Sequence, residues 1–73
     1  MLRLAVVIPT YNEVTNVQNL IDAIAKVSLV NPDTELTVVV IDDSSPDGTA
    51  ALVESLADGW KTDRMSVRVI NKP

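Results

Sequence analysis

The sequence contains no cysteine and no histidine, and these absences exclude several classes of protein. Without cysteine, a disulfide scaffold and the commonest structural zinc sites cannot form. Without histidine, no imidazole can activate a serine, so we reject Ser44 and Ser45 as catalytic nucleophiles. The two glycines, Gly48 and Gly59, fit neither the G-x-G-x-x-G fingerprint nor a Walker A loop.

Basic patches and long apolar runs are also missing. The net charge is −4 and the six Lys and Arg residues are scattered, which argues against nucleic acid as a partner. The longest apolar run, Val38–Ile41 with its flanks, is far shorter than the roughly 20 residues that span a bilayer. The first residues lack the length and cleavage site of a signal peptide. We therefore expect a cytoplasmic location.

The length of 73 residues limits the hydrophobic core that the chain can bury. A complete nucleotide-using enzyme is not expected at this size. We therefore interpret residues 1–73 as an incomplete domain, the N-terminal nucleotide-binding half of a larger one.

Three apolar segments are typical of buried strands. They cover Leu4–Ile8, Leu36–Ile41 and Met65–Ile70. In the first of them the hydrophobicity is continuous rather than alternating. This pattern suits strands that are covered on both faces, as in a parallel sheet.

Two helices are predicted between these strands. The first begins with Thr15 and Gln18 at the spacing of a capping box and ends near residues 27–30. The second begins near Thr49, and Gly59 is a plausible stop. Trp60 lies at helical spacing after Leu56, and we expect it to pack against the core rather than to serve as a stacking platform. The apolar face of the first helix is predicted from Val17, Leu20, Ile21, Ile24 and Val27.

The resulting order is β-α-β-α-β, which predicts an α/β fold. Alternation with short links implies parallel strands joined by right-handed crossovers. This is one half of a doubly wound, mainly parallel sheet, in which ligands bind beyond the carboxyl ends of the strands.

Polar side chains follow two of these strand ends. Pro9, Tyr11 and Glu13 come just after the first strand, and Asp42 and Asp43 end the second. Neighbouring strands lie about 5 Å apart, so these side chains should converge on one crevice. There Tyr11 offers a face for a base or ribose, and the carboxylates can accept hydrogen bonds from sugar hydroxyls or a base.

Each of these residues also has a purely structural alternative. Tyr11 could cover the sheet edge, and Glu13 could be a first-turn acid that complements the helix dipole. Asp42 or Asp43 could cap a turn, and Asp47 could cap the second helix. Five candidates on two adjacent strand ends together favour a binding site.

The segments VVIPTYNE (6–13) and VVVIDDSSPDGT (38–49) resemble the start of a family 2 glycosyltransferase with the GT-A, Rossmann-like fold. The form with SSPDGT most resembles dolichol-phosphate mannosyltransferases, also called polyprenol-phosphate mannosyl synthases. The resemblance covers nearly all of this chain. In such an enzyme, however, it corresponds only to about the first third of the sequence.

The resemblance implies a role for each matching residue. Pro9, Tyr11 and Glu13 would line the nucleotide pocket, while Ile41 and Asp43 would contact the base and ribose of GDP, with Asp43 accepting from the base. The full-length enzyme would transfer mannose from GDP-mannose to dolichyl or polyprenyl phosphate with inversion, at the cytosolic face of a membrane.

The metal and catalytic groups implied by the resemblance lie outside this chain. A divalent cation, Mg²⁺ or Mn²⁺, would be held by an Asp-x-Asp motif beyond Pro73, so we assign no catalytic residue and no metal ligand here. In the parent fold the strand order of this half is 3-2-1, which leaves the first strand as an exposed edge. We expect the chain alone to be inactive and to self-associate through that edge.

Two other functions stay open. The chain could belong to another family 2 glycosyltransferase with a different donor, such as UDP-glucose, or a different acceptor. Alternatively, it could be a non-enzymatic α/β module such as a receiver-like domain, which also places acidic pairs at a strand end.

Overall fold

The computed structural model describes residues 2–72 and contains three strands and two helices in the predicted alternating order. The strands are β1 (Leu2–Thr10), β2 (Thr34–Asp42) and β3 (Met65–Asn71), and the helices are α1 (Val17–Leu29) and α2 (Thr49–Trp60). Each strand includes the predicted segment and extends beyond it. The α/β class is therefore confirmed.

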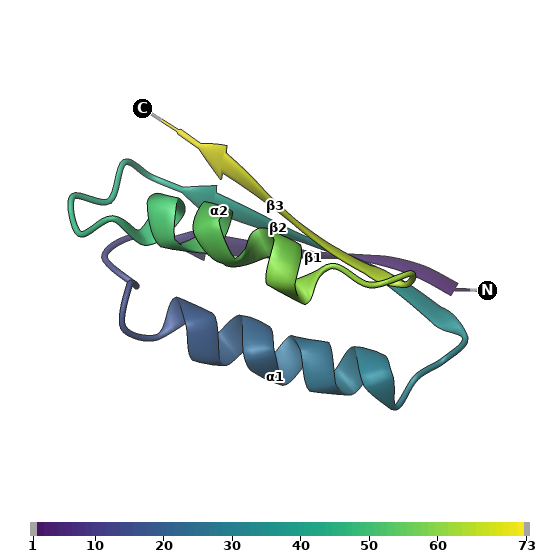
Figure 1. The fold of residues 1–73 in the computed structure, drawn as a ribbon. Coiled ribbons are helices and arrows are strands. Elements are labelled where there is room, and N and C mark those ends of the chain that lie inside the picture. Colours follow the sequence, from purple (N-terminus) through teal and green to yellow (C-terminus); the bar gives the residue numbers. More distant parts are fainter. Residues whose placement is uncertain (1, 73) are drawn as a thin grey trace.

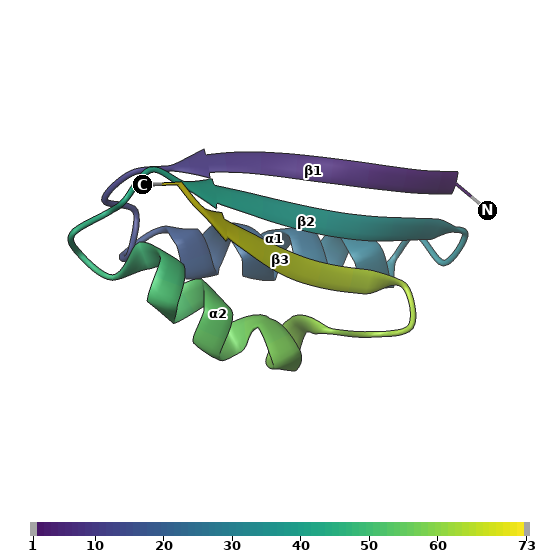
Figure 2. The ribbon, with the colours of Figure 1, turned by 90° about the horizontal axis from the view of Figure 1, so that it is seen from above.

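The strands form one parallel sheet in the order β1-β2-β3, which is the predicted 3-2-1 order. Thr10 lies opposite Asp42, and Asp42 lies opposite Asn71, so all three strands end at the same rim. Both helices cover the same face of the sheet, and the other face is bare within residues 2–72 (Figures 1 and 2).

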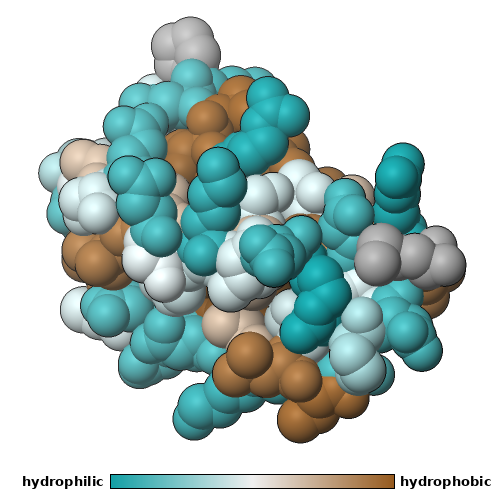
Figure 3. Space-filling view, turned by 45° about the vertical axis from the view of Figure 1, so that its right-hand side comes forward, coloured by the Kyte–Doolittle hydropathy of each residue, from teal (hydrophilic) through white to brown (hydrophobic). Residues whose placement is uncertain are grey.

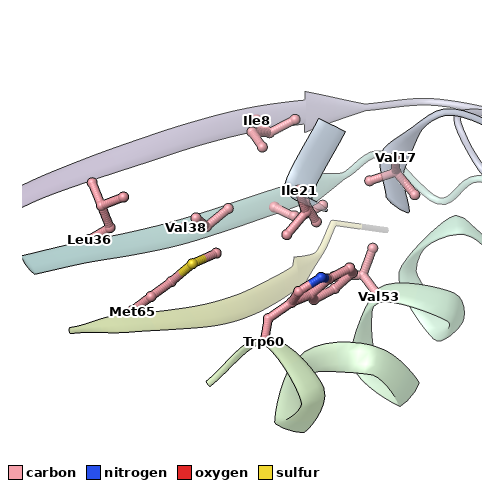
Figure 4. Packing of buried hydrophobic residues seen from close by; sticks show 9 residues of the cluster. Ile8, Val17, Ile21, Leu36, Val38, Val53, Trp60 and Met65 are labelled. Atoms are coloured by element: carbon pink, nitrogen blue, oxygen red, sulfur yellow. The ribbon is translucent and has the colours of Figure 1, made fainter. Parts of the chain in front are cut away.

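The core lies between the sheet and the two helices. Alternate residues of β2 point into it, because successive side chains of a strand face opposite sides. Val38, Val40, Ile21 and Val53 have no exposed surface. Figure 4 shows the cluster, in which Trp60 from the end of α2 lies beside Val53 and Ile21. The prediction that Trp60 packs against the core is confirmed.

The apolar stripe of α1 is narrower than predicted. Val17 and Ile21 are buried and Ile24 is partly buried, but Leu20 and Val27 are 47% and 54% exposed. β1 is an edge strand, so the surface of the sheet and of α1 beyond β1 has no neighbouring element within residues 2–72. Apolar side chains consequently reach the surface between polar ones, as the brown patches of Figure 3 show.

Two predicted helix boundaries are wrong. The capping box of Thr15 and Gln18 does not form, because α1 begins one residue later and its N-cap, Asn16, has no side-chain capping bond. The main-chain amides of Asn16 and Val17 donate to the carbonyl of Glu13 instead. Gly59 does not stop α2, which continues to Trp60 because the indole is anchored in the core.

Candidate site at the strand ends

The carboxyl ends of β1 and β2 enclose a shallow hollow of about 340 Å³. Four of the five predicted site residues line it: Pro9 and Tyr11 from β1 and its loop, and Ile41 and Asp43 from the end of β2. Their proximity follows from the register, in which Pro9 is opposite Ile41. Lys72, beyond the end of β3, lines the same hollow and supplies a cation.

The fifth predicted residue, Glu13, does not line this hollow. It lines a second hollow of about 390 Å³ with Pro9, Leu20 and parts of α1. Glu13 lies four residues before α1, and the first turn of that helix contains no acidic residue. The alternative that Glu13 complements the helix dipole as a first-turn acid is therefore wrong.

The two adjacent aspartates have opposite environments. Asp42 is 1% exposed, and its carboxylate accepts hydrogen bonds from the Thr10 hydroxyl (2.6 Å), the Ser45 hydroxyl (2.6 Å) and the Ser45 amide (2.9 Å). Asp43 is exposed at the hollow, and its main-chain amide donates to the carbonyl of Thr10. Asp42 is thus occupied inside the fold, while Asp43 can reach a ligand.

The ionised form of Asp42 is stabilised where it stands. Burial alone would raise the pKa of its carboxyl group, but the side-chain bonds from Ser45 and Thr10 and the amide of Ser45 outweigh burial and lower the pKa below its ordinary value. Asp42 is therefore ionised at neutral pH, and it accepts hydrogen bonds from the ends of two segments, Thr10 and Ser45.

Asp47 performs a similar role at the start of α2. Its Oδ1 accepts from the amide and the hydroxyl of Thr49, and its Oδ2 accepts from the amide of Val14 at 3.2 Å. The Thr49 hydroxyl is the main reason that the pKa of Asp47 is lowered. The expected contact of Asp47 with the start of α2 is present, although the N-cap position itself is Gly48.

Sequence reasoning missed three residues of this rim. Thr10 and Ser45 hold Asp42, and Lys72 lines the hollow. Thr10 carried a usable signal, because it ends β1 as Asp42 ends β2 and in-register strand ends face each other. Ser45 and Lys72 carried none, since a loop conformation and the end of a third strand decide their positions.

Two kinds of feature are absent from residues 2–72. No group of three or more Asp, Glu, His or Cys side chains is arranged to hold a metal ion. Neither of the two helices in this part of the chain is long and apolar enough to span a membrane.

Comparison with known families decides how this rim is interpreted. Residues 5–73 match the model of glycosyl transferase family 2. The chain belongs to glycosyl transferase family 2. This membership favours the glycosyltransferase interpretation over the receiver-like module, and it agrees with the parallel β-α-β-α-β arrangement.

Similar proteins include the poly(ribitol-phosphate) beta-N-acetylglucosaminyltransferase TarS of Staphylococcus aureus, in strains Mu50 and MW2. Each is 41% identical to this family 2 chain over 54 residues, which are 74% of the chain. The match spans only 9% of the length of these relatives. No solved structure matches the chain significantly.

Proposed function

We propose that this chain holds the nucleoside part of a nucleotide-sugar donor in the hollow between the ends of β1 and β2. The observation that carries the proposal is the placement of Tyr11, Ile41 and Asp43 around one hollow at the rim of a parallel sheet. A planar base could lie against the exposed ring of Tyr11 and the apolar side of Ile41. Asp43 would accept from the N–H edge of that base, and Lys72 would face the anionic diphosphate.

The donor and acceptor proposed for the whole protein are GDP-mannose and dolichyl or polyprenyl phosphate, with inversion at the sugar carbon. The support is the segment SSPDGT (44–49) after the acidic pair. The phosphate of such an acceptor is already an anion, so it can attack the sugar without a strong base. We propose that this whole protein acts at the cytosolic face of a membrane.

A different donor has specific support from the similar proteins. The name of TarS describes transfer of N-acetylglucosamine to poly(ribitol-phosphate). A second candidate function is therefore transfer of another sugar, from a donor such as a uridine diphosphate sugar, to another acceptor.

A divalent cation does not fit the described residues. They provide no cluster of ligating side chains, and the carboxylate of Asp42 is already occupied by Thr10 and Ser45. We propose that the Mg²⁺ or Mn²⁺ used by the whole enzyme is held by residues outside this chain, and that residues 1–73 are its nucleoside-binding half without catalytic activity of their own.

A titration of the ¹⁵N-labelled chain with GDP and with UDP tests the site. We expect shifts confined to the rim, and loss of binding by about tenfold or more in Asp43→Ala, because a hydrogen bond to a charged acceptor is worth roughly 1.5–3 kcal/mol. Asp63→Ala, an exposed aspartate in the loop before β3, is the matched control. Unchanged affinity in Asp43→Ala would refute this placement of the base.

The same titration separates the two donors. Tighter binding of GDP than of UDP supports the mannosyl transferase, and the reverse order supports the second candidate. Transfer assays on the whole protein, with radiolabelled GDP-mannose or uridine diphosphate sugars and polyprenyl phosphate, then test the acceptor.

The outer edge of β1 supports the proposal that the isolated chain self-associates. Leu2 donates to Asp33, on the β2 side, and alternate residues of a strand point their main-chain groups to opposite sides. The amides of Arg3, Ala5 and Val7 therefore face outward, where residues 2–72 place no other strand. We expect dimers or larger species in sedimentation at tens of micromolar. A purely monomeric profile would contradict this.

A further inference from the structure

Three consecutive main-chain amides of the β1–α1 loop donate to side chains of the β2–α2 loop and of Thr49, the first residue of α2. The amide of Asn12 donates to the Ser45 hydroxyl at 2.9 Å, that of Glu13 to the Thr49 hydroxyl at 3.1 Å, and that of Val14 to Asp47 at 3.2 Å. The two loops are far apart in sequence, so these bonds cross-link them.

Both hydroxyls are themselves held by a carboxylate. The Ser45 hydroxyl accepts from Asn12 and donates to Asp42, while the Thr49 hydroxyl accepts from Glu13 and donates to Asp47. A hydroxyl that donates to an anion is a better acceptor, because chains of hydrogen bonds polarise one another. Each loop amide is therefore connected to a fixed negative charge.

The backbone is shaped for this arrangement. Gly48 has φ +84°, a left-handed conformation that side chains rarely adopt, and it lies between Asp47 and Thr49. This turn allows both neighbours to face the β1–α1 loop. On the opposite side, Asn12 also has positive φ (54°), at the point where its amide reaches Ser45.

Tyr11 lies between two residues that are held in this way. Before it, Thr10 donates its hydroxyl to Asp42 and accepts from the amide of Asp43. After it, Asn12 is held by Ser45. Tyr11 is 57% exposed, so the fixed backbone on either side, rather than burial in the core, determines where it lies.

From this geometry we propose that Ser45, Asp47 and Thr49 are positioning residues. They hold the backbone of residues 12–14, and through it they set the place of Tyr11 at the hollow beside Asp43, without touching the nucleotide. The effect on nucleotide affinity rests on the proposed function; the effect on the loop does not.

The test compares Thr49→Val with Thr49→Ser. Thr49 is fully buried, and valine keeps its shape but removes the hydroxyl, whereas serine keeps the hydroxyl. The control is Ser55→Ala, which removes a hydroxyl of the same helix that donates within α2, to the Leu52 carbonyl. Amide hydrogen exchange by NMR reports on the loop without nucleotide, and titration with GDP and UDP reports on the site.

We expect Thr49→Val to speed exchange of the Glu13 amide by about tenfold. This factor corresponds to losing one hydrogen bond whose contribution to stability is near the upper end of the usual range. Exchange at Val38 in the core should stay unchanged, which distinguishes loop release from global unfolding. Affinity for the preferred nucleotide should fall roughly three- to tenfold. Thr49→Ser and Ser55→Ala should behave as wild type.

Unchanged exchange of the Glu13 amide in Thr49→Val would overturn the proposal. So would faster exchange with unaltered nucleotide affinity, because the loop would then not position the site. If the wild-type chain binds neither GDP nor UDP, the proposed function fails, and the exchange measurement alone still decides whether these residues hold the loop.

Discussion

The two ends of the sheet are held together by opposite kinds of group. At the carboxyl end, the carboxylates of Asp42 and Asp47 accept hydrogen bonds from the loops. At the amino end, Arg64 donates from Nη1 to the carbonyls of Ser28 and Asn31, both at 3.0 Å. Carboxylates thus hold the loops at the carboxyl end, whereas at the amino end the guanidinium of Arg64 binds carbonyls at the end of α1.

The amino end follows the usual electrostatics of a helix. The carbonyls at the C-terminus of α1 carry partial negative charge and lack partners within the helix, so a guanidinium there is favourable. Trp60 adds a second link, because its indole N–H donates to Asp22 of α1 at 2.7 Å. This end joins α1 to α2 and β3, and none of its residues lines the hollow.

The rim contains both buried polar groups that hold the loops and exposed groups at the hollow. Asp42 and Asp43 are adjacent, yet Asp42 is buried and hydrogen-bonded to the loops, whereas Asp43 is exposed at the hollow. Polar side chains that hold the backbone leave Tyr11, Asp43 and Lys72 available at its surface. At the amino end, all such groups serve the fold.

The largest expected effect is that of Asp42→Ala. Removing this buried carboxylate leaves the Thr10 hydroxyl and the Ser45 hydroxyl and amide without their acceptor, and we expect a loss of about 3 kcal/mol in the free energy of unfolding. Asp43→Ala, one residue further on and exposed, should change stability by less than about 0.5 kcal/mol. Urea denaturation followed by circular dichroism measures both.

Equal losses in the two variants would remove the distinction between a structural and a binding aspartate. Since a chain of this length is only marginally stable, the midpoint of the urea transition is the quantity to compare. A loss in Asp43→Ala larger than in Asp42→Ala would reverse our assignment of the pair.

Most of the fold could be predicted from the sequence because each strand contains a short, mainly apolar segment between turn-rich or helical segments. Such runs as Val38–Ile41 are unambiguous when both ends carry turn residues, and the end of a strand fixes which side chains meet at the rim. The alternation of strands and helices and the convergence of Pro9, Tyr11 and Asp43 follow from these local signals. The strand order and the place of Ile41 are implied only by the resemblance to family 2 glycosyltransferases.

The remaining features depend on contacts that local patterns do not encode. Thr15 and Gln18 have capping spacing, but the carbonyl of Glu13 accepts from the first amides instead. Leu20 and Val27 have helical spacing, but β1 has no neighbour on their side within residues 2–72. Which aspartate of a pair is buried is likewise decided by Thr10 and Ser45, from other segments.

Acid should loosen the carboxyl end before the amino end. Asp42 and Asp47 have lowered pKa values in the folded chain, so the stability they contribute is present above their ordinary value of 3.8 and is lost as the pH falls through the lowered values. Between pH 5 and about pH 3, protection from amide exchange, measured relative to the intrinsic rate at each pH, should fall first at residues 12–14. Amides such as those of Thr34 and Thr62 should follow later.

The order in which the two ends lose protection in acid tests whether they are held independently. Simultaneous loss of protection at both ends would mean that the chain unfolds as one unit and that the carboxylates do not act locally. In Asp42→Asn the acid sensitivity of residues 12–14 should shrink, because one of the two titrating groups is gone.

The smallest effect is expected at the amino end, from Trp60→Phe. Phenylalanine keeps an aromatic ring in the core but removes the indole N–H that donates to Asp22, so we expect a loss of about 1 kcal/mol. Urea denaturation measures this loss, with Lys61→Ala, the exposed next residue, as the control. Exchange of the amides of residues 12–14 should not change, because Trp60 neither lines the hollow nor bonds to these amides. Faster exchange there would show that the two ends are coupled through α2, and that the positions of Tyr11 and Asp43 depend on the whole helix rather than on its first turn.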